Sequence, residues 1–207
     1  MLFRSHAWSA VIDGSGTVTR LVDYPVATAA TRAPERFRSM LLDGWGDDTY
    51  GVVRTEVFRR TALHGSYHFA DRTISAELAL HGPFYQVPER LYFRRDHPEM
   101  AERAHLTVRS RCANLDPRRA SRLRHPAARL YAEYMWAYIR AIWRAPLTAA
   151  ERLECYGYLA RWMTGRALPV AGRVLSGQGL AIDGPVPEQQ PVISVAALVA
   201  GQEGRHS

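Results

Sequence analysis

The stretch from Tyr50 to Glu99 carries a carboxylate, paired arginines and a histidine at the junctions of its expected elements. A carboxylate such as Asp71 can take a proton from a hydroxyl that lies within hydrogen-bond reach. The guanidinium groups of Arg94 and Arg95 suit the geometry of phosphate oxygens. Because binding and catalytic residues concentrate where secondary-structure elements end, the functional site is expected in this stretch.

Two strands and two helices are expected to position these residues. Tyr50 to Val53 is a short apolar run typical of a strand, and Thr55 to Leu63 has helical spacing. A second helix begins near Asp71 and ends before Gly82, and the strand from Phe84 to Val87 stops at the proline that follows it. An aspartate at a helix N-terminus can also cap the helix and complement its dipole, so a structural role for it stays open.

The flanking segments extend the α/β pattern. Residues 2–12 alternate as in a strand and end at a turn over residues 13–16, with a partner strand at 17–20. Pro34 opens a helix that runs to Leu42. This succession predicts a mixed α/β domain.

The C-terminal part is predicted to contain a helical hairpin. Ala127 to Arg144 forms a long amphipathic helix that Pro146 ends. Thr148 and Glu151 then have the spacing of a capping box, which predicts a second helix through Met163.

In this order the central motifs resemble the acceptor-side, C-terminal half of family 2 glycosyltransferases with a GT-A fold. The family pattern is a YGLxR strand and turn, an aspartate that begins a helix, an LxxLGxFxxVPExLxxRR segment and a closing histidine. The matching residues here are Tyr50, Gly51, Arg54, Asp71, Leu78 to Glu89, Leu91, Arg94, Arg95 and His97.

The resemblance implies roles for the ionisable residues. Asp71 would be the general base that deprotonates the acceptor hydroxyl as it attacks the anomeric carbon of a nucleotide sugar. Arg94 and Arg95 would face the diphosphate leaving group, and His97 would contact the metal or the diphosphate. Alternatively, residues 94–97 (RRDH) could form a solvent-exposed turn that binds no ligand.

Arg54 and Trp45 would bind the substrate on the acceptor side. Trp45 lies between two glycines, where its ring could stack on an acceptor sugar or pack onto the sheet. Stacking on a sugar and packing onto the sheet are both hypotheses for Trp45.

The family holds a divalent metal, Mn²⁺ or Mg²⁺, with a DxD or DD motif in a preceding nucleotide-binding half. The nearest match, Asp47 and Asp48, follows the predicted helix at Pro34 and therefore departs from the family order. We expect an acceptor half that is inactive alone, whether as a fragment, through a misplaced start or as part of a split enzyme. Its expected partners are a nucleotide sugar, a hydroxyl acceptor and an N-terminal half or partner protein.

The predicted fold class is α/β, a partial GT-A-like mixed sheet with flanking helices followed by a C-terminal helical hairpin. The expected boundaries are 1–105 for the GT-A-like half, 106–126 for an arginine-rich linker, 127–165 for the hairpin and 166–207 for a flexible tail.

All 27 basic residues are arginines, and the formal net charge is +7. Between residues 109 and 129, seven arginines face only Asp116, so this block holds a net +6. Prolines interrupt the block, so specific nucleic-acid binding is not expected.

A noncatalytic binding or scaffolding protein derived from the same fold is the alternative function. The aromatic residues and arginines of the hairpin suit a membrane surface or a partner groove, and they suit ordinary packing equally well. Two distant cysteines and the lack of a signal-peptide pattern or a bilayer-length apolar run predict a cytoplasmic protein, with peripheral membrane attachment as the second option.

Overall fold

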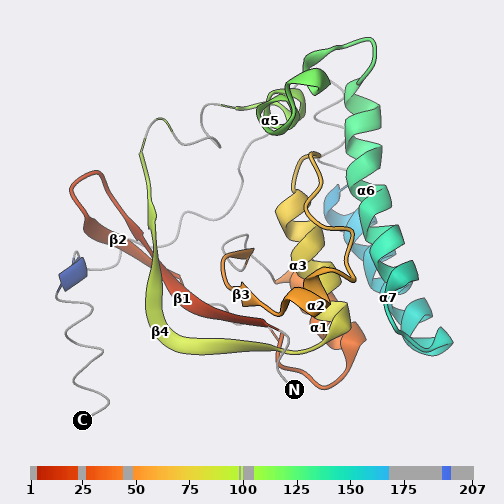
Figure 1. Cartoon of the computed structure of the whole chain (residues 1–207), viewed down its shortest axis with the longest axis horizontal. Helices are drawn as coiled ribbons and strands as arrows, with labels where there is room; N and C mark the ends of the chain where they lie inside the picture. Colours follow the sequence, from red (N-terminus) through yellow and green to blue (C-terminus); the bar gives the residue numbers. More distant parts are fainter. Residues whose placement is uncertain are drawn as a thin grey trace.

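The computed structural model describes residues 4–22, 27–43, 49–97, 99, 105–167 and 193–196 (Figure 1). These residues form a mixed α/β structure in which helices flank a small open sheet, as predicted. The strands are β1 (Arg4–Ile12), β2 (Thr17–Val22), β3 (Val52–Val53), β4 (Phe84–Arg95) and β5 (Ile193–Ser194). The α-helices are α1 (Ala33–Leu42), α2 (Thr55–Phe58), α3 (Ala70–His81), α5 (Val108–Leu115), α6 (Ala127–Arg144) and α7 (Ala149–Trp162). A short 3₁₀ helix, η2 (Pro117–Ala120), and a short π-helix, η3 (Met163–Ala167), complete the helical elements described.

The sheet is built around β1. This strand pairs in parallel with β4 along one edge. Along its other edge it pairs antiparallel with β3 near its start and with β2 near its end. Ser9 and Ala10 of β1 point to opposite faces of the sheet and are both buried, so β1 is covered on both faces there.

The expectation that the strand beginning at Phe84 stops before Pro88 is wrong, because β4 continues to Arg95. The pairing passes from Val87 opposite Ala7 to Arg90 opposite Trp8, so the proline lies in a bulge. A bulge tolerates proline because the residue there need not donate to the ladder. The bulged strand bends sharply in Figure 1, and this bend shapes the candidate site.

The predicted helix from Thr55 to Leu63 is too long. α2 ends after one turn, and Leu63 has a left-handed φ of 60° with 48% of its surface exposed. The hydroxyl of Thr61 donates to the Phe58 carbonyl at 2.7 Å and accepts from the Leu63 N–H at 3.1 Å. These side-chain bonds satisfy backbone groups that the next helical turn would otherwise use.

The largest hydrophobic core joins α1 and α3 to the predicted hairpin of α6 and α7, which the structure confirms. The Thr148 hydroxyl accepts from the Glu151 N–H at 3.3 Å, and the Glu151 carboxylate accepts from the Thr148 N–H at 3.0 Å, completing the predicted capping box. Core members from all four helices are Phe37, Leu80, Tyr138, Ile142 and Trp162.

The arginine-rich segment contains structure that the sequence did not predict. α5 begins with a Thr107–Ser110 capping box, and its residues Val108 and Cys112 pack against Leu130 of α6. Of the predicted tail, only residues 166–167 and 193–196 are described, and β5 pairs antiparallel with β2. Among the described helices, none is both long and apolar enough to cross a bilayer.

Candidate functional site

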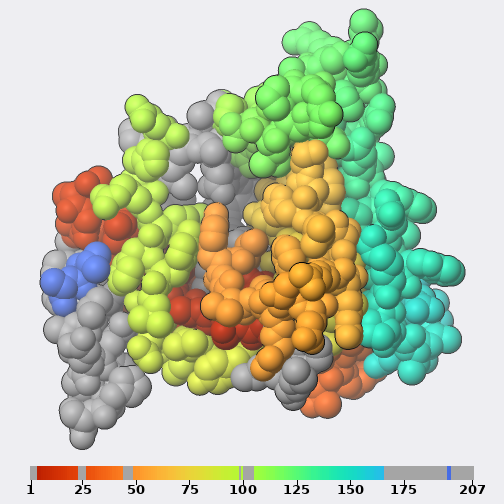
Figure 2. Space-filling model, in the orientation of Figure 1, coloured from red at the N-terminus to blue at the C-terminus, as the bar shows by residue number. Residues whose placement is uncertain are grey.

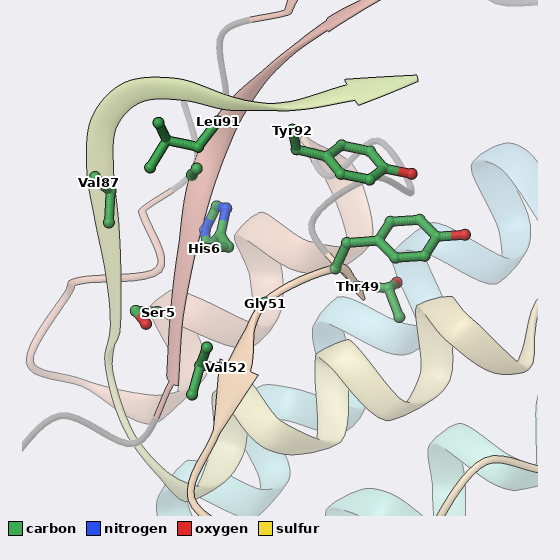
Figure 3. Close-up of a pocket in the computed structure, with 10 residues that line it drawn as sticks. Ser5, His6, Thr49, Gly51, Val52, Val87, Leu91 and Tyr92 are labelled. Carbon is green, nitrogen blue, oxygen red and sulfur yellow. The ribbon is translucent and has the colours of Figure 1, made fainter. Parts of the chain in front are cut away.

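A pocket of about 550 Å³ lies between β1, the bent part of β4 and the segment around β3 (Figure 3). β1 and β4 diverge here because the bulge in β4 breaks their regular pairing. The lining residues are Ser5, His6, Ala7, Thr49, Tyr50, Gly51, Val52, Val87, Leu91 and Tyr92.

Two tyrosines form an aromatic wall of the pocket. The rings of Tyr50 and Tyr92 stack with centroids 4.8 Å apart and an interplanar angle of 17°. Tyr50 is 58% exposed, and the neighbouring Leu91 is 60% exposed. Exposed apolar side chains around a concave surface are the usual lining of a small-molecule site. Aromatic faces of this kind suit the apolar C–H face of a sugar ring.

Gly51 allows the β3 segment to lie against β1. A Cβ atom at this position would be 2.3 Å from the carbonyl oxygen of Ser5, which is backbone and cannot move aside cheaply. Close packing against β1 therefore explains the glycine of the YGVVR motif. The same packing places Tyr50 at the pocket.

His6 lines the pocket from β1 and is only 3% exposed. Burial, followed by the positive charge of Arg4, lowers the pKa of His6 to about 4. Its ring meets Phe84 edge to face at 6.4 Å. The imidazole is therefore neutral at neutral pH. Sequence analysis did not single out this histidine, because an alternating strand pattern does not show which face meets a pocket.

Asp71 does not line the pocket, but it lies on the same face of α3 as a residue that contacts the pocket wall. Ser75, four residues later and therefore on the same helix face, has its hydroxyl 3.3 Å from the hydroxyl of the pocket residue Thr49. Asp71 is four residues, about 6 Å of helix rise, nearer the N-terminus. Its Oδ1 accepts from the Arg72 N–H at 2.9 Å, and its Oδ2 has no hydrogen-bond partner among the described residues. Oδ1 thus accepts a hydrogen bond from a backbone N–H in the first turn of α3, and Oδ2 remains available to a ligand.

The two predicted phosphate-binding arginines separate. β4 pairs regularly with β1 from Tyr92 to its end, so Arg94 lies on the Tyr92 face while Arg95 lies on the opposite face. Arg95 donates from Nη1 to the carbonyls of Asp13 and Gly14, both at 2.9 Å, and so holds the β1–β2 turn. Arg94 is therefore the better placed of the two for a ligand that extends beyond Tyr92.

The other predicted site residues lie apart from the pocket or outside the description. Arg54 is exposed at the start of α2 and does not line the pocket, and Trp45 lies outside the described residues. His97 follows β4 and is half-buried. No group of three His, Cys, Asp or Glu side chains suited to a metal occurs among the described residues. The divalent metal stays a prediction.

Comparison of the chain with protein-family models, curated proteins and solved structures found no match. The resemblance to family 2 glycosyltransferases therefore rests on the sequence motifs alone.

Proposed function

We propose that this chain forms the acceptor-binding side of a glycosyltransferase site. The pocket would hold an acceptor saccharide against the Tyr50–Tyr92 stack, with one hydroxyl directed toward Asp71. Arg94, on the Tyr92 face of β4, would contact the far end of the ligand.

One observation carries the proposal: the contact between the Thr49 and Ser75 hydroxyls joins the aromatic pocket to the face of α3 that carries Asp71. A saccharide needs an apolar platform for its ring and polar groups for its hydroxyls, and this arrangement offers both. The motif order seen in the sequence supports the same assignment independently of the pocket.

The proposed reaction is transfer of a sugar from a nucleotide sugar. The acceptor oxygen forms a bond to the anomeric carbon, the bond from that carbon to the phosphate oxygen breaks, and the nucleoside diphosphate leaves with the bonding electrons. Asp71 takes the proton of the acceptor hydroxyl as the new bond forms. The described residues supply this acceptor and base function, and no step here is assigned to a metal.

We expect simple methyl glycosides to bind this chain weakly, at millimolar concentration, and to contact the tyrosine rings. Tyr92→Ala should weaken the preferred glycoside by about tenfold, because it removes half of the aromatic platform. Asp71→Asn should weaken this binding less than Tyr92→Ala does, because the asparagine oxygen can still accept a hydrogen bond from the acceptor hydroxyl. Saturation-transfer NMR on the 207-residue chain measures both effects.

Tyr85→Ala is the matched control, because Tyr85 is on the same strand and 48% exposed but does not line the pocket. It should bind the glycoside like the unmodified chain. Absence of glycoside binding, or equal loss in the Tyr85 and Tyr92 variants, would refute the acceptor pocket.

The chain alone is expected to bind no UDP or GDP sugar at micromolar concentration in the presence of Mn²⁺, and to transfer no sugar. Binding of the diphosphate and metal supplies much of the leaving-group stabilisation in this chemistry. Isothermal titration calorimetry on the full chain tests this directly. Micromolar binding would contradict an acceptor-only assignment, and in that event Asp71→Asn should abolish transfer while leaving donor binding intact.

Noncatalytic binding is the second candidate function, and the exposed face of α6 favours it. Trp136 and Trp143 are 57% and 71% exposed and lie seven residues apart, which places them on one helix face. Tyr134, Tyr138 and Trp162, in contrast, are buried in the main core. These three aromatic side chains therefore serve packing, whereas Trp136 and Trp143 are exposed aromatic side chains of the described hairpin that a partner could contact.

A further inference from the structure

The segment between α5 and α6 forms a protruding tip of the molecule, remote from the pocket, at the top of Figure 2. Leu123 is 96% exposed there, and the flanking Arg122 and Arg124 are exposed as well. Leu115, at the end of α5, is 49% exposed. The tip therefore presents apolar and cationic side chains together.

Hydrogen bonds fix the shape of this tip. The His125 N–H donates to the Ser121 carbonyl at 3.0 Å, which closes the turn around Leu123. Arg109 donates from Nη1 to the carbonyls of Ser121 and His125 at 3.2 and 2.6 Å. Arg129 donates to the Arg124 carbonyl at 2.9 Å. Leu123 is thus held outward by a braced turn.

The tip carries more positive than negative charge. Arg118 pairs with Asp116, and Arg119 and Arg129 share Glu133. Between residues 115 and 124 there are four arginines and one aspartate, so this segment has a formal net charge of +3. The side chains of Arg122 and Arg124 have no partner among the described residues.

We propose that this tip, residues 115–124, docks on the surface of an anionic lipid bilayer. Leu123 enters the interface between headgroups and acyl chains, while Arg122 and Arg124 bind lipid phosphates. Charge attraction brings cationic segments to anionic membranes, and a buried apolar side chain adds binding that salt does not screen. An exposed leucine between two arginines fits a bilayer better than a nucleic acid, whose backbone offers the leucine no apolar contact.

Flotation of the full chain with phosphatidylcholine vesicles containing phosphatidylserine tests the proposal. Each arginine contributes about fivefold to partitioning onto an anionic surface, so Arg122→Gln with Arg124→Gln should reduce binding by about 25-fold. Arg59→Gln with Arg161→Gln removes two exposed charges elsewhere and should leave binding nearly unchanged.

Leu123→Ser should reduce binding by about tenfold at both low and high salt, because salt does not screen the apolar contribution. Leu153→Ser, at a residue 72% exposed on α7, should have no effect. Equal binding to pure phosphatidylcholine would overturn the proposal. So would loss of binding in Trp136→Ala with Trp143→Ala but not in the tip variants, or binding to heparin that matches the vesicles and ignores Leu123.

Discussion

The chain should lose about 5 kcal/mol of its free energy of unfolding between pH 7 and pH 4.5 through two buried histidines. His6 and His68 are each only 3% exposed. Burial, then Arg4, lowers the pKa of His6 to about 4. Burial, then Arg111 and Arg72, lowers the pKa of His68 to about 3.

The direction of this effect follows from which state binds the proton first. In the unfolded chain both histidines titrate near pH 6.5. Between pH 6.5 and the lower folded pKa values, each histidine is therefore protonated in the unfolded state and neutral in the folded state. Their stabilising contribution is therefore fully present above pH 6.5 and is lost as the pH falls toward the folded pKa values. Each histidine accounts for roughly 2.5 kcal/mol at pH 4.5, where most carboxylates are still ionised.

Urea unfolding at pH 7.0 and 4.5 measures the loss. His6→Leu and His68→Leu should each reduce the difference between the two pH values by about half, even if either substitution also lowers stability by a constant amount. His64→Leu, at an exposed histidine, is the control and should keep the full difference. A pH dependence that survives in both core variants would show that other groups cause it.

Arg144→Met is expected to destabilise the chain by about 3–5 kcal/mol, because it leaves a buried carboxylate without its cation. Glu77 on α3 has a side chain only 3% exposed. Its Oε1 accepts from Arg144 of α6 at 3.1 and 3.2 Å, and its Oε2 accepts from the Ala62 N–H at 3.0 Å. This one side chain links α3, α6 and the loop after α2.

Combining Arg144→Met with Glu77→Gln should recover much of the stability, because the amide carries no charge and can still accept from the Ala62 N–H. Arg140→Met, at an exposed residue one turn earlier on α6, should cost less than about 0.5 kcal/mol. Thermal and urea unfolding of the single and double variants give the coupling energy. If the two effects simply add, the pair does not act as a buried ion pair.

Elements with strong local signals were predictable from the sequence. The helices α1, α3, α6 and α7 match their expected ranges because helical periodicity, a proline at the start and a capping box act within a few residues. The two wrong element ends, those of α2 and β4, each have a cause at the end concerned. The Thr61 hydroxyl ended α2 early, and the bulge carried β4 past Pro88.

The site was predictable only in part. The YGVVR motif pointed to Tyr50 and Gly51, both of which line the pocket. Nothing in the sequence indicated His6 or Tyr92. They come close to Tyr50 only because β1 pairs with β4, and these two strands are far apart in the sequence. No periodicity in one strand can reveal which residues of another strand will lie opposite it.

The sequence by itself determined the element types, the hairpin of α6 and α7 and the positive charge of the segment around Leu123, since these follow from residue order and composition. Only the tertiary structure decided that Arg95 braces a turn while Arg94 shares a face with Tyr92, and that Ser75, on the Asp71 face of α3, contacts the pocket residue Thr49. The reason is physical: helix formation depends on neighbours in the chain, whereas a binding site depends on the register between distant segments, which packing selects.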